Sequence, residues 1–402
     1  MSLKRNFSLM FWLEALTEVK MINVVTAIFL VYRGISVAQI FYTTIVFSVV
    51  TLLTELPSSY LADKWGRKKV ILLSLFFNLT NWVVFIFAHS LLAFCVGFAL
   101  MAVSDALMSG TDEALIYDTN KALGDEKNSL SNLGKYFSAK RIFKIITPLL
   151  AVLIAGNLRD ERFVTLLIID SLAGVAAIIL GLFLTEPKHY LKIEKMEKGV
   201  FKDAVNIFKK NPELMRVITG KVLFFMANFA IWRISSEMFR NNGVAVIMIG
   251  VSNSFYSLVV FIINRFTGKL GMGEKIYIWI NRFGDWTLGC ILLMAINEVW
   301  WKSGYLGLGL FCGVVIFESS RWPLFSELFN RVSHSYNRAT VLSLSNLLKS
   351  ILEIPTMLLC AIFVGWGYQY LLLWCGGLAL TATIFFRVKN KPKEKAIPNQ
   401  AF

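Results

Sequence analysis

Apolar residues along the chain gather into twelve runs, each about as long as a membrane-spanning helix. A helix needs roughly 20 apolar residues to cross a hydrocarbon core about 30 Å thick. The runs predict spans at 9–31, 37–60, 70–89, 91–117, 137–156, 163–185, 217–239, 244–264, 276–297, 303–327, 339–363 and 367–386. The pattern therefore predicts an all-α polytopic membrane protein with twelve transmembrane helices.

The longest polar segment, 186–216, divides these spans into six and six. It predicts an N-terminal six-helix bundle at 1–185, a solvated linker at 186–216, a C-terminal six-helix bundle at 217–386 and a basic tail at 387–402. The two predicted bundles resemble each other weakly, because ALIYD at 114–118 and PLFSE at 323–327 occupy similar places. Parallel repeats of this kind place a substrate site between the halves near the membrane midplane, with access that alternates.

The basic residues predict the orientation of the spans. Of the 41 lysines and arginines, 30 lie at one set of span ends, and five lie at the other: Arg33, Arg159, Arg162, Arg240 and Lys302. Cytoplasmic loops carry the excess of Lys and Arg. We therefore expect both termini in the cytoplasm of a bacterial cell, with the chain in its cytoplasmic membrane. The net charge of +15 then reflects topology, and no nucleic-acid partner is expected.

Composition excludes several other classes. Only 17% of the residues are charged, against about 25% in a soluble domain. The five cysteines lie inside apolar runs, in no metal-ligand spacing. No Gly-rich nucleotide loop or nucleophile arrangement is evident. The sequence therefore predicts no enzyme activity, no cofactor and no metal, and we expect a monomer.

One polar motif carries a family resemblance. Ser59-x-Leu61-Ala62-Asp63-Lys64-x-Gly66-Arg67-Lys68 resembles the loop between spans two and three of the major facilitator superfamily, with Ser59 in place of the first Gly of that pattern. SGTDEALIYD at 109–118 and NRATVLSLSNL at 337–347 resemble a bacterial branch of drug or metabolite exporters. The resemblance implies the major facilitator fold, two six-helix bundles and secondary transport. Span five has Pro148 without the preceding Gly that exporters with proton antiport often carry.

The resemblance also implies a conformational latch at Asp63, Gly66, Arg67 and Asp118. Asp63 would lie near the N-terminus of span eleven, where a helix dipole favours a carboxylate. Arg67 would pair with Asp118, while Gly66 permits the tight turn. The alternative is a basic loop that only sets topology, without a latch.

Acidic residues inside the predicted spans are candidates for substrate or proton binding, because charges are costly there. Glu14 and Glu18 are four residues apart, so they share one helix face and repel each other. They could bind a cation or share a proton, or they could pair with Lys20. Asp105 is a further candidate. Asp112 and Glu113, nearer the cytoplasmic end, are expected to act in gating.

The C-terminal half adds basic candidates, Arg233 and Arg321. Each has an acid close along its own helix, Glu237 and Glu318, so self-pairing is an open alternative. Carboxylates on one wall and guanidinium groups on the other would suit a cationic or zwitterionic solute.

We therefore expect a secondary active transporter that moves a small molecule across the lipid bilayer by alternating access. A proton-coupled exporter of drug-like compounds is the first hypothesis, and a proton-coupled uptake symporter for a metabolite is the second. A membrane sensor without transport activity is a third, which the short linker and tail disfavour.

Overall fold

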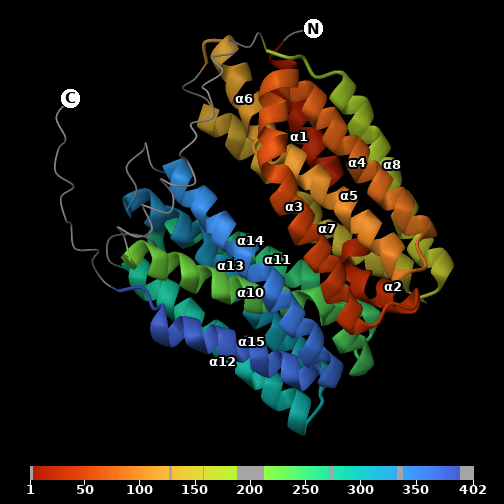
Figure 1. The fold of residues 1–402 in the computed structure, drawn as a ribbon, viewed down its shortest axis with the longest axis vertical. Coiled ribbons are helices and arrows are strands. Elements are labelled where there is room, and N and C mark those ends of the chain that lie inside the picture. Colours follow the sequence, from red (N-terminus) through yellow and green to blue (C-terminus); the bar gives the residue numbers. More distant parts are fainter. Residues whose placement is uncertain are drawn as a thin grey trace.

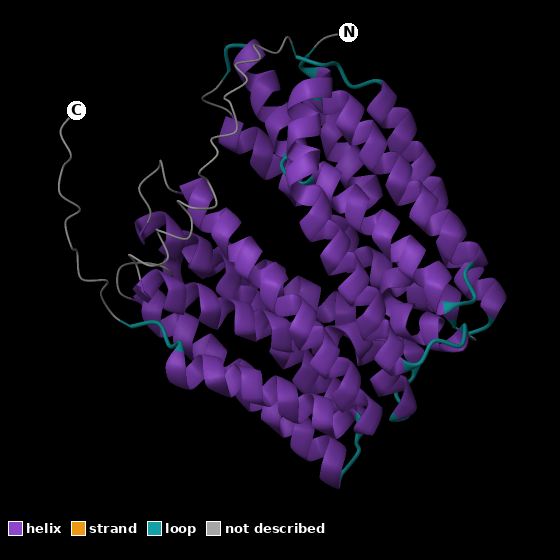
Figure 2. Ribbon diagram, viewed as in Figure 1, coloured by secondary structure: helices purple, strands orange, loops and turns teal. Residues whose placement is uncertain are grey.

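The computed structural model describes residues 3–125, 129–156, 158–187, 212–270, 275–332 and 338–389, and within them it contains helices and short loops but no strand (Figure 2). Most of the predicted linker and the basic tail beyond 389 lie outside the described residues. The helices of the first half are α1 (Arg5–Thr17), the 3-10 helix η1 (Met21–Val25), α2 (Thr26–Tyr32), α3 (Val37–Trp65), α4 (Arg67–Phe87), α5 (Leu91–Met108), α6 (Thr111–Ala122), α7 (Ser129–Ala155) and α8 (Asp160–Leu182). Those of the second half are α10 (Pro212–Asn241), α11 (Val246–Leu270), α12 (Lys275–Trp300), α13 (Gly304–Val332), α14 (Arg338–Trp366) and α15 (Tyr368–Phe385).

The first predicted span is broken near its middle. α1 ends at Thr17, Lys20 leaves the helical conformation, and η1 starts at Met21. The new N-terminus needs acceptors for its free N–H groups. Asp170 of α8 supplies them, because its Oδ1 accepts from the Met21 N–H at 2.7 Å and its Oδ2 from the Ile22 N–H at 3.1 Å. A side chain from another helix thus stabilises the break between α1 and η1.

The fourth predicted span is also broken. α5 ends at Met108 and α6 begins at Thr111, with Gly110 between them at φ +75°. This left-handed conformation is open to glycine at little steric cost. Asp112 and Glu113 then fall in the first turn of α6, where a helix dipole favours negative charge.

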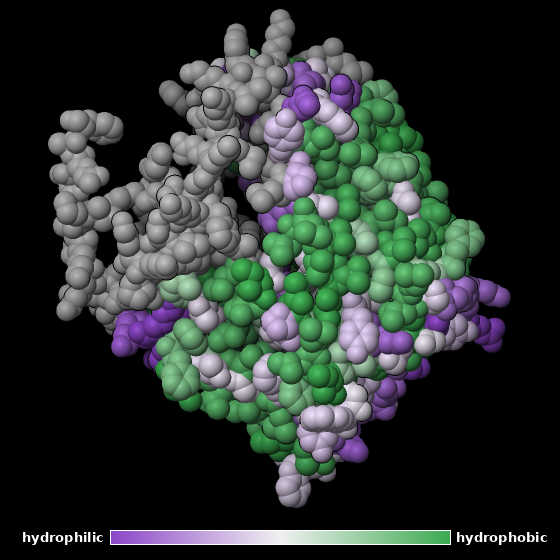
Figure 3. Space-filling model, in the orientation of Figure 1, coloured by the Kyte–Doolittle hydropathy of each residue, from purple (hydrophilic) through white to green (hydrophobic). Residues whose placement is uncertain are grey.

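Ten segments within the described residues are long and apolar enough to cross a membrane. Of the twelve predicted spans, two do not meet this criterion within the described residues: α7, whose described apolar stretch is Phe143–Ala155, and α12, which carries Arg282 and Asp285. Both are continuous helices. The chain is a multi-pass membrane protein, and the predicted all-α fold is confirmed. Figure 3 shows the matching surface, with a broad hydrophobic face and hydrophilic residues towards its ends.

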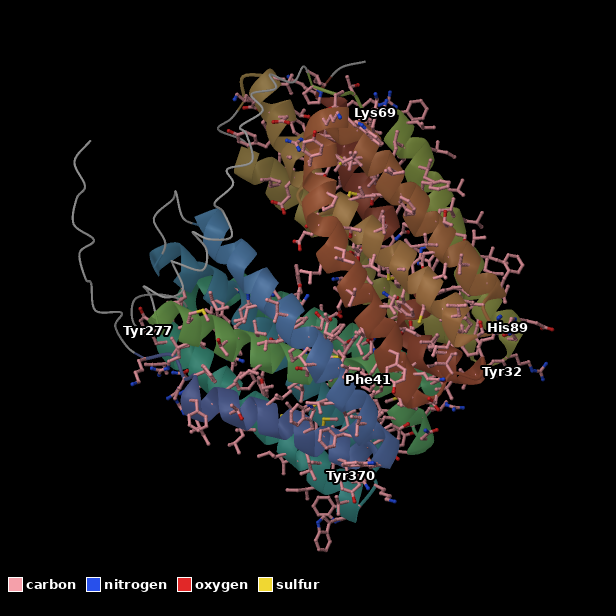
Figure 4. All side chains as sticks on the ribbon, viewed as in Figure 1. Tyr32, Phe41, Lys69, His89, Tyr277 and Tyr370 are labelled. Atoms are coloured by element: carbon pink, nitrogen blue, oxygen red, sulfur yellow. The ribbon has the colours of Figure 1, made fainter. Side chains whose placement is uncertain are left out.

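The helices form two groups that diverge towards one end of the molecule (Figure 1). Lys69 and Tyr277 lie at this end, which we call the basic end (Figure 4). Tyr32, His89 and Tyr370 lie at the other, which we call the opposite end (Figure 4).

The two groups meet along α3 with α14 and along α7 with α11. At the second seam the Ser254 hydroxyl donates to the Ile145 carbonyl at 2.7 Å. A Cβ at Gly250 would collide with Val152 and would lie 2.8 Å from the Pro148 carbonyl oxygen. These contacts lie in the first turns of α11, which begins at the opposite end. The halves are therefore closed against each other on that side.

The buried cores repeat this asymmetry. One large apolar cluster joins both halves and includes Phe29, Phe41, Phe239 and Phe311. A separate cluster around Leu13, Ile71, Leu115 and Tyr136 belongs to the first half alone. The helix break after Thr17 falls between the two clusters, because Leu16 packs against the second and Val19 against the first. The basic-end part of the first half therefore has its own core.

Candidate functional site

A cavity of about 620 Å³ lies between the two halves. The first half lines it from the α1–η1 break and α7, and the second half lines it from α10, α11 and α13. A volume of this order is typical of a small-molecule site, which spans about 300–1,000 Å³. Parallel repeats place a site at this junction, so its position agrees with the one that the internal repeat predicts.

Aromatic rings cover the second-half wall of the cavity. Phe225, Phe229 and Trp232 recur at helical spacing on one face of α10. The first two rings are 5.5 Å apart with planes at 12°, and the next pair is 6.2 Å apart at 15°. Trp322 of α13 meets Phe225 edge-on, with centroids 5.8 Å apart. The second-half wall of the cavity is therefore aromatic, and its rings stack on one another along α10.

Neutral polar groups lie beside these rings. Asn228, Asn253, Asn264 and Tyr256 all line the cavity. The Tyr256 hydroxyl donates to Asn253 Oδ1, and the Asn253 amide nitrogen donates to the Ile249 carbonyl at 2.7 Å. Asn228 Oδ1 has no hydrogen-bond partner among the described residues. The cavity can therefore offer amide groups to a polar ligand.

Charged groups of both signs also line the cavity. From the first half come Glu18, Lys20 and Lys144, and Lys144 Nζ lies 4.0 Å from Glu18 Oε2. From the second half comes Glu318, which is buried and accepts hydrogen bonds from the Trp322 indole N–H at 3.0 and 3.2 Å. Two carboxylates and two ammonium groups leave the wall without a dominant sign. Such a site accommodates a ligand that carries charge of either sign or both.

Lys20 stands at the α1–η1 break among acids. Its ammonium group interacts electrostatically with Glu18, Asp105, Glu14 and Asp170, in falling order of strength. Asp105 itself is exposed and does not line the cavity. The structure thus brings three predicted acids, Glu14, Glu18 and Asp105, around one half-buried lysine.

Glu14 and Asp112 meet at a tyrosine that the sequence analysis did not single out. The Tyr136 hydroxyl lies 2.7 Å from Glu14 Oε2 and 2.6 Å from Asp112 Oδ2. Glu14, Asp112 and Tyr136 are only 3%, 7% and 2% exposed. Glu113 follows Asp112 in the chain but is exposed. Glu14 therefore faces the protein interior with Asp112, whereas Glu18 faces the cavity.

The predicted latch residues lie at the basic end. Arg67 Nε is 3.6 Å from Asp118 Oδ2, which gives the expected ion pair. Gly66 has φ +96°, and a Cβ there would lie 3.1 Å from the Glu186 carboxyl carbon. Glu186 caps α4 by accepting from the Arg67 N–H at 2.9 Å and the Lys68 N–H at 2.7 Å. The Asp63 side chain lies outside the described residues, and so do the side chains of residues 338–347 at the start of span eleven.

The two predicted arginines lie away from the cavity wall. Arg233 donates to Thr44 Oγ1 of α3 at 2.7 Å and lies 4.7 Å from the Phe98 ring centroid. It therefore joins the halves instead of pairing with Glu237. Glu237 pairs with Arg240 at 2.6 Å.

Arg321 points into the second half. It is 4% exposed and lies 4.0 Å from the Phe224 ring centroid. Its Nε and Nη1 have no hydrogen-bond partner among the described residues. Because burial strips water from the guanidinium group, the aromatic faces supply much of its stabilisation. A direct contact between Arg321 and a ligand in the cavity does not follow from this position.

Several functional residues have no strong sequence signal. Tyr136 lies in an ordinary-looking amphipathic stretch, and Glu186 lies in what reads as a polar linker. The aromatic wall does have a sequence signal, because Phe225, Phe229 and Trp232 repeat at helical spacing. That same spacing is typical of lipid-facing helices, so only the fold assigns those rings to a cavity.

Comparison with known proteins gives a family match over most of the chain. The family model of the Major Facilitator Superfamily matches residues 9–352. The uncharacterized MFS-type transporter YxaM of Bacillus subtilis (strain 168) is 26% identical over 212 residues. That alignment covers 50% of this chain and 49% of YxaM, so the chain spans about half the length of this curated relative.

Solved structures of transporters share the fold. A mutant of the nucleoside transporter NupG superposes with a TM-score of 0.79 at 11% identity, covering 96% of this chain and 98% of that one. A D-xylose-proton symporter gives 0.71 at 10% identity over 97% and 100%. A bacterial homologue of the iron transporter ferroportin, in an inward-facing state, gives 0.73 at 15% over 96% and 98%. At these identities the likeness concerns the fold alone.

Proposed function

The chain belongs to the major facilitator superfamily, and from that premise we propose that it is a proton-coupled exporter of a small aromatic solute that is cationic or zwitterionic. Family and fold make it a membrane transporter of small molecules. The direction, the coupling ion and the solute class are the proposal. The observation that carries it is the cavity between the halves, with its stacked rings beside charged groups.

The aromatic wall supports a planar cargo. Stacked rings contribute about 0.5–1.5 kcal/mol beyond area burial, and cations bind well over such faces. Glu18 and Glu318 offer carboxylates to a cationic group, while Lys20 and Lys144 offer partners to an anionic one. A flat solute with an amine, or with an amine and a carboxylate, satisfies both kinds of wall.

Carboxyl groups inside the membrane region support proton coupling. Glu14, Glu18 and Asp105 surround Lys20 at the α1–η1 break. Ionisable groups at this depth are costly and mark ion or proton pathways. A change in the protonation of these groups alters the charge of the site that binds the solute. Proton movement and solute movement are coupled in this way.

The basic end supports the proposed orientation. Its lysines and arginines favour a cytoplasmic position, with both termini on that side of a bacterial cytoplasmic membrane. The halves are closed at the opposite end by contacts such as Arg233–Thr44 and Ser254–Ile145. In this orientation the closed side is outside the cell. The chain would act as a monomer, because one chain supplies both walls of the cavity.

The latch and the gate complete the proposal. Arg67 and Asp118 are paired within the first half, so their pair can present Asp63 to span eleven when the halves close at the basic end. Gly66 permits the turn that carries these residues. Asp112 and Glu113, directly after the break at Gly110, would respond to that closure.

Uptake of a metabolite by proton symport is the second candidate. The amides Asn228, Asn253 and Asn264 favour it, because a neutral polar metabolite needs such hydrogen-bonding partners. The known D-xylose-proton symporter and nucleoside transporter share the fold, and the fold serves either direction.

Proteoliposomes test the proposal with ethidium, a planar aromatic cation, as the probe. We expect an imposed proton gradient to drive ethidium against the direction of proton movement, and we expect Glu18→Gln to abolish the gradient effect. Arg282→Gln, a charge removed outside the cavity wall, is the matched control. Movement of probe together with protons would favour symport. Flux that ignores the gradient would reject proton coupling.

A further inference from the structure

The Tyr136 hydroxyl makes short contacts with the carboxyl groups of both Glu14 and Asp112. Each contact needs a hydrogen atom between its two oxygens, and the tyrosine can supply only one. A tyrosine hydroxyl has one hydrogen to donate. Its oxygen lies within hydrogen-bond distance of two carboxyl groups, at 2.7 Å to Glu14 and 2.6 Å to Asp112. One contact can use the tyrosine hydrogen. The other needs a hydrogen from a carboxyl group, because two bare oxygen acceptors repel each other.

We propose that Glu14, Tyr136 and Asp112 form a proton-binding site separate from the cargo cavity, holding one exchangeable proton on Glu14. The inference rests on the proposed proton-coupled transport and assigns its proton to a place. Tyr136, Glu14 and Asp112 do not line the cavity. All three are buried, so the proton is shielded from water.

Helix dipoles decide which carboxyl group holds the proton. Asp112 lies in the first turn of α6, where the free N–H groups favour a negative charge. Its Oδ1 also accepts from the Glu113 N–H at 2.8 Å. Glu14 lies in the last turn of α1, where the helix dipole disfavours a carboxylate. Glu14 therefore donates to the Tyr136 oxygen, and Tyr136 donates to the Asp112 carboxylate.

The same geometry links the proton to the cavity. Glu18 lies one helical turn beyond Glu14, a rise of about 6 Å, and it lines the cavity beside Lys144. The proton on Glu14 can pass to the Glu18 carboxylate, which lines the cavity, and this transfer leaves Glu14 as an anion. Lys20, Asp170 and Asp105 also face this region.

Loss of the proton moves helices. Once Glu14 is ionised, its contact with the Tyr136 oxygen becomes an unfavourable one, so α1 separates from α7. The separate core cluster around Leu13 and Tyr136 allows this part of the first half to move as one packed unit. The breaks at Lys20 and Gly110 give it two places to bend. Because α7 also lines the cavity, a movement of α7 that follows proton release changes the cavity wall.

Infrared spectroscopy of the protein in lipid nanodiscs tests the site without any substrate or gradient. At pH 7, where exposed carboxyl groups are ionised, we expect a carbonyl band of a protonated carboxyl group that Glu14→Gln removes. Tyr136→Phe should move the band to higher frequency, because the carboxyl group loses its acceptor. Glu113→Gln, one residue from Asp112, is the matched control and should leave the band unchanged.

Three results would overturn the assignment. They are a wild-type spectrum without the band, a band that survives Glu14→Gln, and a band unmoved by Tyr136→Phe. If Glu14→Gln does not fold, Tyr136→Phe decides alone, since it removes one oxygen only. The flux assay separates the two proposals. A band with gradient-insensitive ethidium flux rejects coupled transport and retains the site, whereas coupled flux without the band rejects the site alone.

Discussion

The two halves of the molecule use charge inside the membrane in different ways. In the first half, acids stand at interruptions of helices: Glu18 and Asp170 at the α1–η1 break and Asp112 after Gly110. In the second half, the described helices α10 to α15 are uninterrupted.

There the basic side chains lie over aromatic rings. Arg321 is 4.0 Å from the Phe224 centroid, Lys221 Nζ is 4.5 Å from that of Trp322, and Lys349 Nζ is 4.7 Å from that of Phe225. An aromatic face stabilises a cation without breaking a backbone hydrogen bond. The helices of the first half can therefore bend where charged residues interrupt them. The continuous helices of the second half form a more rigid wall of the cavity.

The largest expected effect comes from removing the side chain that holds the α1–η1 break. Asp170→Ala leaves the Met21 and Ile22 N–H groups without their acceptor. Since a hydrogen bond to a charged group contributes about 1.5–3 kcal/mol, we expect a loss of roughly 3–5 kcal/mol. The thermal unfolding midpoint in nanodiscs measures it.

Ser171→Ala, the next residue on the same helix, is the control for this variant. Among the described residues its hydroxyl bonds only to the Leu167 carbonyl, so its removal should cost no more than about 1 kcal/mol. Equal losses in the two variants would contradict the view that Asp170 holds the break.

A smaller effect is expected from glycine-to-alanine substitutions, which should differ between the first half, with its interrupted helices, and the second half, with its continuous ones. Gly110→Ala places a Cβ in a left-handed conformation with open space around it, so only the backbone opposes it, by about 1 kcal/mol. Gly289→Ala, in the middle of α12 with equally open space, should instead be neutral or stabilising by up to about 1 kcal/mol. Chemical denaturation of both variants compares them, and destabilisation by Gly289→Ala alone would reverse the comparison.

The smallest expected effect concerns the aromatic wall. Phe229→Ala removes the middle ring of the α10 stack. Stacking worth about 0.5–1.5 kcal/mol corresponds to roughly threefold to tenfold weaker ethidium binding, measured by fluorescence titration. Phe363→Ala removes a ring that stacks on Trp374 outside the cavity, and it should leave ethidium affinity unchanged. If both variants bind alike, the stack is not the cargo wall.

Local sequence accounts for much of the fold. Apolar runs about 20 residues long predict helices that cross a membrane, and ten of these segments meet that criterion within the described residues. The two that do not are α7, whose described apolar stretch is Phe143–Ala155, and α12. Both are continuous helices, because backbone hydrogen bonds within a helix do not depend on its side chains.

The candidate site was less accessible from sequence. Glu18 lines the cavity, whereas Arg233 and Arg321 do not. Spacing along one helix identifies neighbours on that helix, so it suggested that Arg233 pairs with Glu237. The actual partners, Thr44 for Arg233 and Arg240 for Glu237, depend on which way each helix is rotated against its neighbours.

The sequence by itself determined that the chain is helical, crosses a membrane many times and carries the loop motif of its family, because hydropathy, charge bias and a ten-residue pattern are all local. Only the tertiary structure decided which acids meet. Glu14 and Asp112 are 98 residues apart in the chain, and each is within 2.7 Å of Tyr136. Asp170 reaches the break at Met21 from another helix. Such contacts depend on packing across the bundle, which places distant residues within hydrogen-bond range and leaves no trace in their own neighbourhoods.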